Sequence, residues 1–95
     1  MTLLHKTDLK YNYSWIEIEP DNPRVTGLLP ETTLLNRRDG YEVLAFINNF
    51  SFVNNWKKKE FGLKAERLIQ KHLPENIRSH AHVKKWLIDN WRKFD

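Results

Sequence analysis

Apolar residues recur at helical spacing through the second half of the chain, and they predict three helices. The first should begin after Asp39 as the N-cap, with Glu42 three residues later as in a capping box, and should run to about Asn55. The second should span residues 61–72 and end at Leu73-Pro74, because the residue before a proline avoids helical geometry. The third should begin after Ser79 as the N-cap and run to about residue 92.

The first third of the chain has a different pattern, one of alternating aromatic residues. Tyr11, Tyr13 and Trp15 share one parity, and aromatic and β-branched residues favour strands. A turn is expected at residues 20–23, followed by a second short strand over residues 24–29. Two strands alone are marginal in water, so this hairpin needs a helical layer or a strand from a partner. The predicted fold is α+β, with an N-terminal two-stranded antiparallel hairpin packed on a three-helix C-terminal layer.

The length of 95 residues predicts one compact domain, with the hairpin and a loop in residues 1–38 and three helices in residues 39–95. A chain of this size has little material for an enzyme cleft between two lobes. It fits a small binding module better.

The predicted helices differ in how their apolar residues are distributed. The second and third are amphipathic, and in the third only Ile88 falls outside the apolar arc. The first is apolar all round, so either it is a central helix wrapped by its own chain or part of it meets another chain. Its candidate interface residues are Tyr41, Phe52, Val53 and Trp56.

Composition favours an interaction surface, and the charge pattern suggests what such a surface could bind. Aromatic residues make up 13% of the chain, and these side chains are enriched at the buried centres of interfaces. The net charge of +4 is uneven, because residues 1–55 hold five Lys and Arg against seven Asp and Glu, whereas residues 56–95 hold eleven against five. A basic half is consistent with a polyanionic partner, for which the candidate contacts lie on the last two helices: Lys64, Arg67, Lys71, Arg78, Lys84 and Lys85.

Catalytic and metal chemistry have little support in the sequence. Cysteine is absent, and the three glycines are isolated, so no phosphate-binding loop is formed. His80 and His82 are two residues apart, which places them on different sides of a helix, and His72 lies among apolar positions. We therefore expect no catalytic residues, no metal site and no cofactor.

The sequence thus predicts a non-catalytic binding module that acts through protein contact, as a homodimer or on a larger partner, with a wedge between helices that could admit an apolar ligand. The alternative is a nucleic-acid-binding domain that uses the basic C-terminal helices. No apolar run is long enough for a membrane span or a signal peptide, so a cytoplasmic location is expected and a membrane partner is not.

Overall fold

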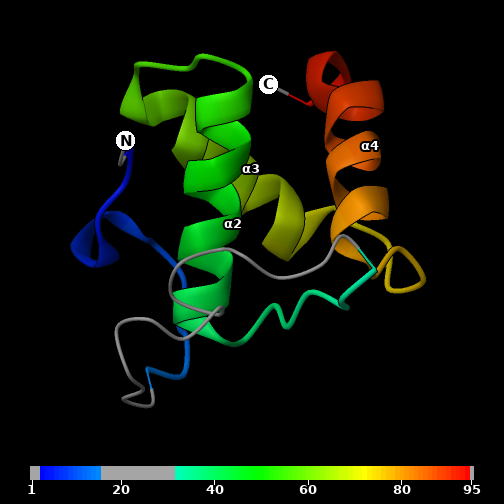
Figure 1. Ribbon diagram of the computed structural model, residues 1–95, viewed down its shortest axis with the longest axis horizontal. Coiled ribbons are helices and arrows are strands. Elements are labelled where there is room, and N and C mark those ends of the chain that lie inside the picture. Colours follow the sequence, from blue (N-terminus) through cyan, green and yellow to red (C-terminus); the bar gives the residue numbers. More distant parts are fainter. Residues whose placement is uncertain (1–2, 16–31, 95) are drawn as a thin grey trace.

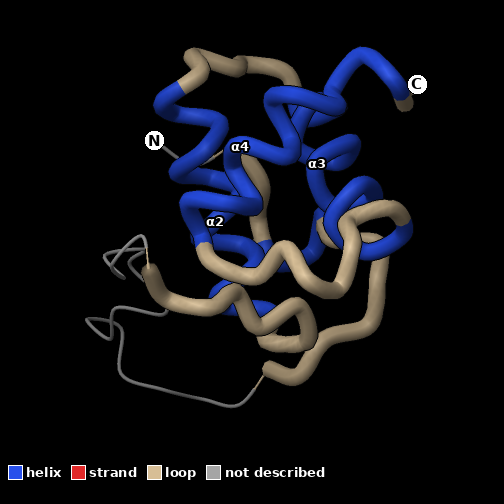
Figure 2. Tube along the Cα trace, turned by 90° about the vertical axis from the view of Figure 1, so that its right-hand side faces the viewer, coloured by secondary structure: helices blue, strands red, loops and turns tan. Residues whose placement is uncertain are grey.

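The computed structural model describes residues 3–15 and 32–94, and the regular structure in these ranges is helical. A short 3₁₀ helix, η1 (Lys6–Asp8), precedes the helices α2 (Gly40–Val53), α3 (Lys59–Lys71) and α4 (His80–Asn90), and a second 3₁₀ turn, η2 (Trp91–Lys93), follows α4. In Figure 1, α2 and α4 run side by side in the same general direction, and α3 crosses behind them. In the view turned by 90°, α3 lies to the right of α2 (Figure 2), and these two helices pack directly against each other.

The predicted α+β fold is wrong, because the described residues contain no strand. Residues 10–15, which were expected to begin the hairpin, follow a non-regular path along the helices. Ser14 N–H donates to the carbonyl of Arg38, and Gly40 N–H donates to the carbonyl of Ser14, which is an isolated bridge to the start of α2. Residues 16–19, the turn and the predicted second strand at 24–29 lie outside the described residues.

The N-terminal segment is bound to the helices by polar side chains instead of by a second strand. The Glu66 carboxylate on α3 is fully buried and accepts the N–H groups of Lys10 and Tyr11 and the hydroxyl of Tyr13. On α2, the Asn48 amide accepts the N–H groups of Leu3 and Leu4 and donates to the Leu4 carbonyl. These bonds satisfy backbone groups that a strand would otherwise pair with a neighbour.

The predicted N-caps of α2 and α4 are confirmed, but the predicted capping box of α2 is wrong, because the Asp39 N–H donates to the Asn36 carbonyl and not to Glu42. The Asp39 carboxylate accepts the N–H groups of Tyr41 and Glu42, and the Ser79 hydroxyl accepts the N–H of His82. The Glu42 carboxylate accepts the N–H of Asn36, three residues before the cap, and lies 3.2 Å from His80 Nε2. Glu42 therefore links the chain before α2 to the first residue of α4.

The end of α2 is a Schellman motif around Asn55, whose φ of 57° is left-handed. Asn55 N–H donates to the Phe52 carbonyl, and Trp56 N–H donates to the Ser51 carbonyl. Asparagine tolerates this conformation, so the Asn54-Asn55 pair ends the helix cleanly. The turn directs Trp56 back toward Phe50, with ring centroids 5.2 Å apart.

The core combines residues from every helix with Leu4 from the N-terminal segment and Leu35 from the chain before α2. On α2 the buried positions include Val43, Phe46, Ile47 and Phe50. Between Gly40 and Ser51, α2 is thus packed on most sides by its own chain. Its last two residues are different, because Phe52 and Val53 remain exposed.

Candidate functional site

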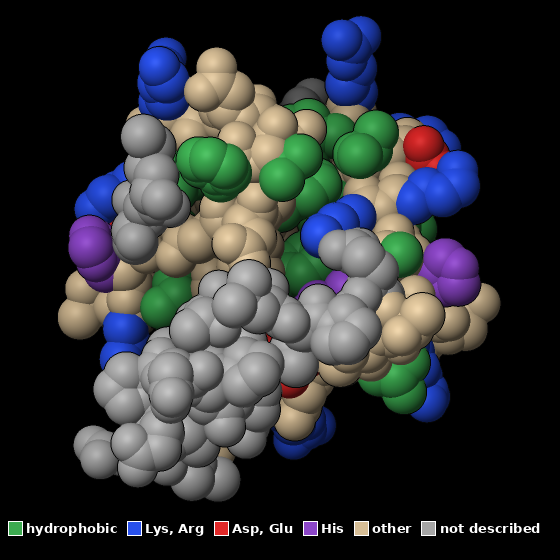
Figure 3. All heavy atoms as spheres, in the orientation of Figure 1, with side chains coloured by type: hydrophobic (Ala, Val, Ile, Leu, Met, Phe, Trp, Pro, Cys, Tyr) green, Lys and Arg blue, Asp and Glu red, His purple; other side chains and the backbone are tan. Residues whose placement is uncertain are grey.

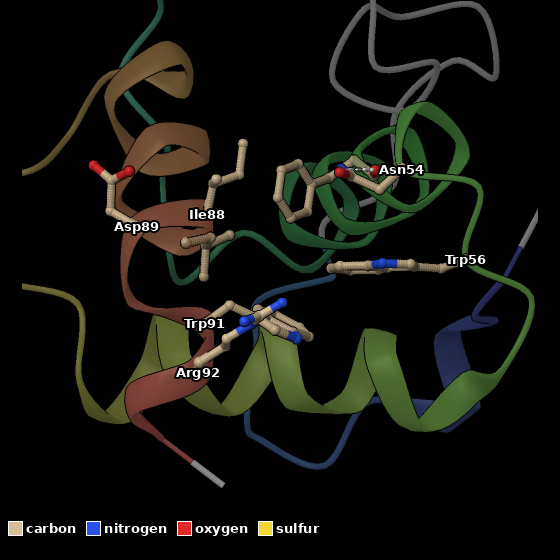
Figure 4. Close-up of a pocket in the computed structure, with 8 residues that line it drawn as sticks. Asn54, Trp56, Ile88, Asp89, Trp91 and Arg92 are labelled. Carbon is tan, nitrogen blue, oxygen red and sulfur yellow. Dashed lines mark hydrogen bonds between the residues drawn. The ribbon is translucent and has the colours of Figure 1, made fainter.

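A pocket of about 310 Å³ opens where α2 and α4 end. Phe50 and Asn54 come from the end of α2, Trp56 from the turn that follows it, and Leu87, Ile88, Asp89, Trp91 and Arg92 from the end of α4 and η2. Figure 4 shows Ile88 projecting from α4 toward the end of α2, while Trp91 and Arg92 lie between α4 and α3. We call this pocket and the exposed apolar residues beside it the α2–α4 groove. Its volume is at the lower end of the range for small-molecule pockets, which suits one or two apolar side chains.

Aromatic rings form one wall of the groove. The Trp56 and Trp91 rings lie 4.6 Å apart at 31°, and Trp56 contacts both Phe50, edge to face, and Phe61. Lys64 of α3 lies over the face of the Trp91 ring, with Nζ 4.7 Å from the ring centroid. Because each ring is in contact with another ring or a cation, little side-chain entropy remains to be lost when a ligand binds.

Exposed apolar side chains occur at the same end of α2 and on α4. Phe52 and Val53 at the end of α2 are 64% and 77% exposed, and Ile88 on α4 is 61% exposed. In Figure 3 apolar side chains gather in the upper part of this face, over the ends of α2 and α4, with Lys and Arg side chains around the edge. A large apolar patch with a polar rim is typical of an interaction surface.

The charges around the groove are mostly basic. Residues 56–64 and 84–94, which include the turn after α2, the start of α3 and most of α4 with η2, contain eight Lys and Arg and two acids. One of the acids, Asp89, is paired with Lys85, with Nζ and Oδ2 3.2 Å apart. Arg92 lines the pocket itself. The potential at the rim is therefore positive.

The structure separates the four predicted interface residues. Trp56 lines the pocket, whereas Phe52 and Val53 are exposed at the end of α2 and do not line it. Tyr41 lies in the first turn of α2, about 16 Å away along the helix, where it contacts Trp15. The sequence prediction grouped Tyr41 with Phe52 because the two residues lie on the same side of the helix. Their separation along the helix axis keeps the two side chains apart.

The six predicted nucleic-acid contacts are divided between α3, α4 and the connection between them, and several make contacts within the chain. Lys64 lies over Trp91, Lys71 Nζ is 5.7 Å from the centre of the Tyr11 ring, and Lys85 is paired with Asp89. Arg78 Nε donates to the carbonyl of Glu75. The other two candidates are Arg67, which is half-buried on α3, and Lys84, which is half-buried on α4.

The histidines are distributed over separate environments. His80 is buried against Glu42 and the Phe46 ring, whereas His72 is exposed and stacks on Phe94 with centroids 4.3 Å apart. In residues 3–15 and 32–94, no three His, Asp or Glu side chains gather in a way that could hold a metal ion. None of the helices in those ranges combines the length and the apolar character that crossing a bilayer requires.

Sequence reasoning missed Ile88 and Trp91 as groove residues. Ile88 was the single apolar residue outside the arc of its helix, and that exception is the signal that could have identified it. Trp91 was assigned to the apolar arc, and its contact with Trp56, 35 positions earlier in the chain, is set by tertiary packing.

Comparisons of the chain with family models, curated proteins and solved structures found no match. The functional argument therefore rests on the geometry described above.

Proposed function

We propose that this protein is a small non-catalytic binding module that docks a partner protein in the α2–α4 groove. The observation that carries the proposal is a pocket walled by Trp56 and Trp91 with the exposed Ile88 in its lining, at the end of the molecule where Phe52 and Val53 are also exposed. Exposing these side chains is unfavourable unless they are covered, since each one buried contributes about 1.5–3 kcal/mol. The contacting Trp56 and Trp91 rings also resemble the fixed aromatic anchors found at the energetic centres of interfaces.

The charge around the groove favours a partner segment with one or two apolar anchors flanked by Asp or Glu. Arg92 at the pocket and the run Lys57-Lys58-Lys59 after Trp56 would lie next to such carboxylates. A second copy of the chain fits less well, because a two-fold axis through the groove would bring the same basic rim against itself. The earlier expectation of a homodimer is therefore replaced by a proposal for an acidic partner segment.

A displayed peptide library, selected on the folded full-length protein, tests the proposal. We expect the selected peptides to share an aromatic or aliphatic anchor with flanking acidic residues. Their binding should weaken at least about tenfold in Ile88→Asp, since one well-packed anchor contact is worth about 1.4 kcal/mol or more. The matched control is Leu34→Asp, which adds the same charge at a residue that is 59% exposed but does not line the pocket.

Three outcomes would contradict this assignment. Peptides without acidic residues would remove the charge argument, and equal binding by Ile88→Asp and Leu34→Asp would remove the site. A stable dimer in light scattering that Val53→Asp dissociates would identify a second copy as the occupant.

Nucleic-acid binding remains the alternative hypothesis. It would use the six basic residues of α3, α4 and their connection, several of which already contact rings, a carboxylate or a carbonyl within the chain. The test is the salt dependence of duplex binding, since each phosphate contact contributes a slope near −0.9 in log K against log salt. Charge reversal at Arg67 and Lys71 would reduce that slope if the hypothesis holds, and would leave peptide binding in the groove unchanged.

A further inference from the structure

We propose that Trp15 and Tyr41 form a binding site for an alkylammonium group, and that Lys6 of the same chain occupies it when no ligand is bound. The two rings meet nearly at a right angle, with centroids 5.1 Å apart and planes at 85°. Lys6 Nζ lies over both rings, 4.6 Å from the Trp15 centroid and 5.6 Å from the Tyr41 centroid. This aromatic corner is at the opposite end of α2 from the groove, so it does not depend on the function proposed there.

The corner is held by backbone contacts on both sides of Trp15. Ser14 exchanges two backbone hydrogen bonds with residues 38 and 40, which fixes the chain immediately before the indole. Gly40 then allows the indole to lie against the helix, because a Cβ at that position would be 2.5 Å from the ring. Tyr13 supports the indole from the side, with centroids 6.0 Å apart. The indole is therefore positioned before any ligand arrives.

Lys6 is also positioned, although its side chain is exposed and free to leave. It is the first residue of η1, where the Asp8 carboxylate accepts the N–H of His5 and pairs with Lys59. The observed cation shows that the two ring faces can be approached together by one ammonium group. An exposed cation–π contact is weak, so a ligand can displace the Lys6 ammonium at small cost.

The chemistry of the corner favours an alkylated ammonium over lysine itself. The faces of aromatic rings are negative and attract cations, and two perpendicular faces can contact two methyl groups of one trimethylammonium. A primary ammonium is strongly hydrated and keeps its water, whereas a trimethylammonium has no N–H donors to hydrate. The ligand class is therefore a quaternary or methylated ammonium, carried by a small molecule such as choline or by a methylated lysine of another protein.

The test is a titration of the isotope-labelled full-length protein with tetramethylammonium chloride, followed by the indole N–H signal of Trp15 in NMR spectra. The signal is assigned with Trp15→Phe, and sodium chloride serves as the ionic-strength control. We expect a saturable shift of Trp15 that is absent with neopentyl alcohol, which has a similar shape and no charge. Removal of the plug in Lys6→Ala should tighten the apparent affinity about 2- to 5-fold, which corresponds to an exposed cation–π contact.

The matched control is Lys10→Ala, which removes an exposed lysine of the same segment away from the two rings. A Trp15 signal that does not respond in Lys6→Ala, while the rest of the spectrum remains that of the folded protein, overturns the site. Equal affinities in Lys6→Ala and Lys10→Ala overturn the role of Lys6. Tighter binding of a trimethyllysine peptide than of choline supports the site and identifies a methylated protein as the source of the ammonium group. Equal binding of the peptide and choline supports the site and identifies a small molecule as the source.

Discussion

Replacing Glu66 should release the N-terminal segment from α3. In the fully buried Glu66 carboxylate, the oxygens lie 3.0 Å from the Lys10 nitrogen, 3.3 Å from the Tyr11 nitrogen and 2.7 Å from the Tyr13 hydroxyl. Hydrogen bonds to a charged group contribute about 1.5–3 kcal/mol each. Their sum is an upper limit, because the released donors can reach water once the segment moves away.

We therefore expect Glu66→Ala to lower the free energy of unfolding by about 3–5 kcal/mol, which is below that sum because water replaces part of the lost bonds. Glu66→Gln keeps one acceptor oxygen but turns an NH₂ group toward the donors, so about 2 kcal/mol should be lost. A protein of 95 residues has a total free energy of unfolding of about 5–14 kcal/mol, so the alanine variant should be close to the limit of stability.

Urea unfolding followed by circular dichroism measures the change. With a slope of about 1.5 kcal/mol/M, Glu66→Ala should lower the midpoint by about 2–3 M. The control is Glu60→Ala on the exposed first turn of the same helix, which should cost less than about 1 kcal/mol. Hydrogen exchange should show faster exchange at the amides of Lys10 and Tyr11. A loss below about 1 kcal/mol in Glu66→Ala, with those amides still protected, would refute the reasoning.

Three further predictions concern the residues around the same segment and the connection after α3. Burial and the bond to Glu66 raise the pKa of Tyr13 above its ordinary value. The stability that the protonated hydroxyl contributes is therefore complete below pH about 10 and is lost as the pH rises further. In urea unfolding across that range, the free energy of unfolding should decline less in Tyr13→Phe than in the unsubstituted protein. Gly40→Ala should lower the free energy of unfolding by about 1 kcal/mol in the same assay, because overpacking against Trp15 exceeds the gain in helix propensity. A more stable variant with an unchanged indole N–H signal of Trp15 in NMR spectra would contradict this. Arg37→Met should cost about 2–3 kcal/mol, because the guanidinium donates to three carbonyls between α3 and α4. The control is Arg38→Met at an exposed residue, which should be nearly neutral. Equal thermal midpoints for the two variants would show that the Arg37 bonds contribute nothing.

Helix positions could be predicted from the sequence because their signals are local. Asp39, Ser79 and Leu73-Pro74 act on residues within one turn, and the observed helices begin or end within about two residues of the expected places. The Asn54-Asn55 pair forms the stop of α2, because asparagine has a low helix propensity and tolerates the left-handed conformation.

The hairpin prediction failed because alternation alone does not identify the partner. Tyr11, Tyr13 and Trp15 alternate as in a strand, yet the N-terminal segment is bound by side chains of α2 and α3 that lie 44–57 residues away. A usable signal was present in the helices. Glu66 lies on the same side of its helix as Gly62 and Ile69, and a carboxylate buried there needs hydrogen-bond donors from elsewhere in the chain. Asn48 is likewise a polar residue within an apolar helix, and its amide also needs buried partners.

The groove was predictable in part. Phe52, Val53 and Trp56 followed from the apolar excess of the first helix, because such an excess must be covered or exposed. The second side of the groove, with Ile88 and Trp91, depends on how α4 lies against α2, and this arrangement has no local signature.

The long separation between the N-terminal segment and its binding residues also constrains the order of events during synthesis. Lys10 emerges 56 residues before Glu66, which at typical translation rates corresponds to about 3–11 s without its acceptor. Leu4 and Trp15 have no helix to cover them until α2 has emerged, and a chain that stops before α3 still lacks Gly62, against which Leu4 packs, and the Glu66 carboxylate. Nascent chains of this protein should therefore engage chaperones until α3 has left the ribosome, and slower translation of residues 16–58 should prolong that requirement.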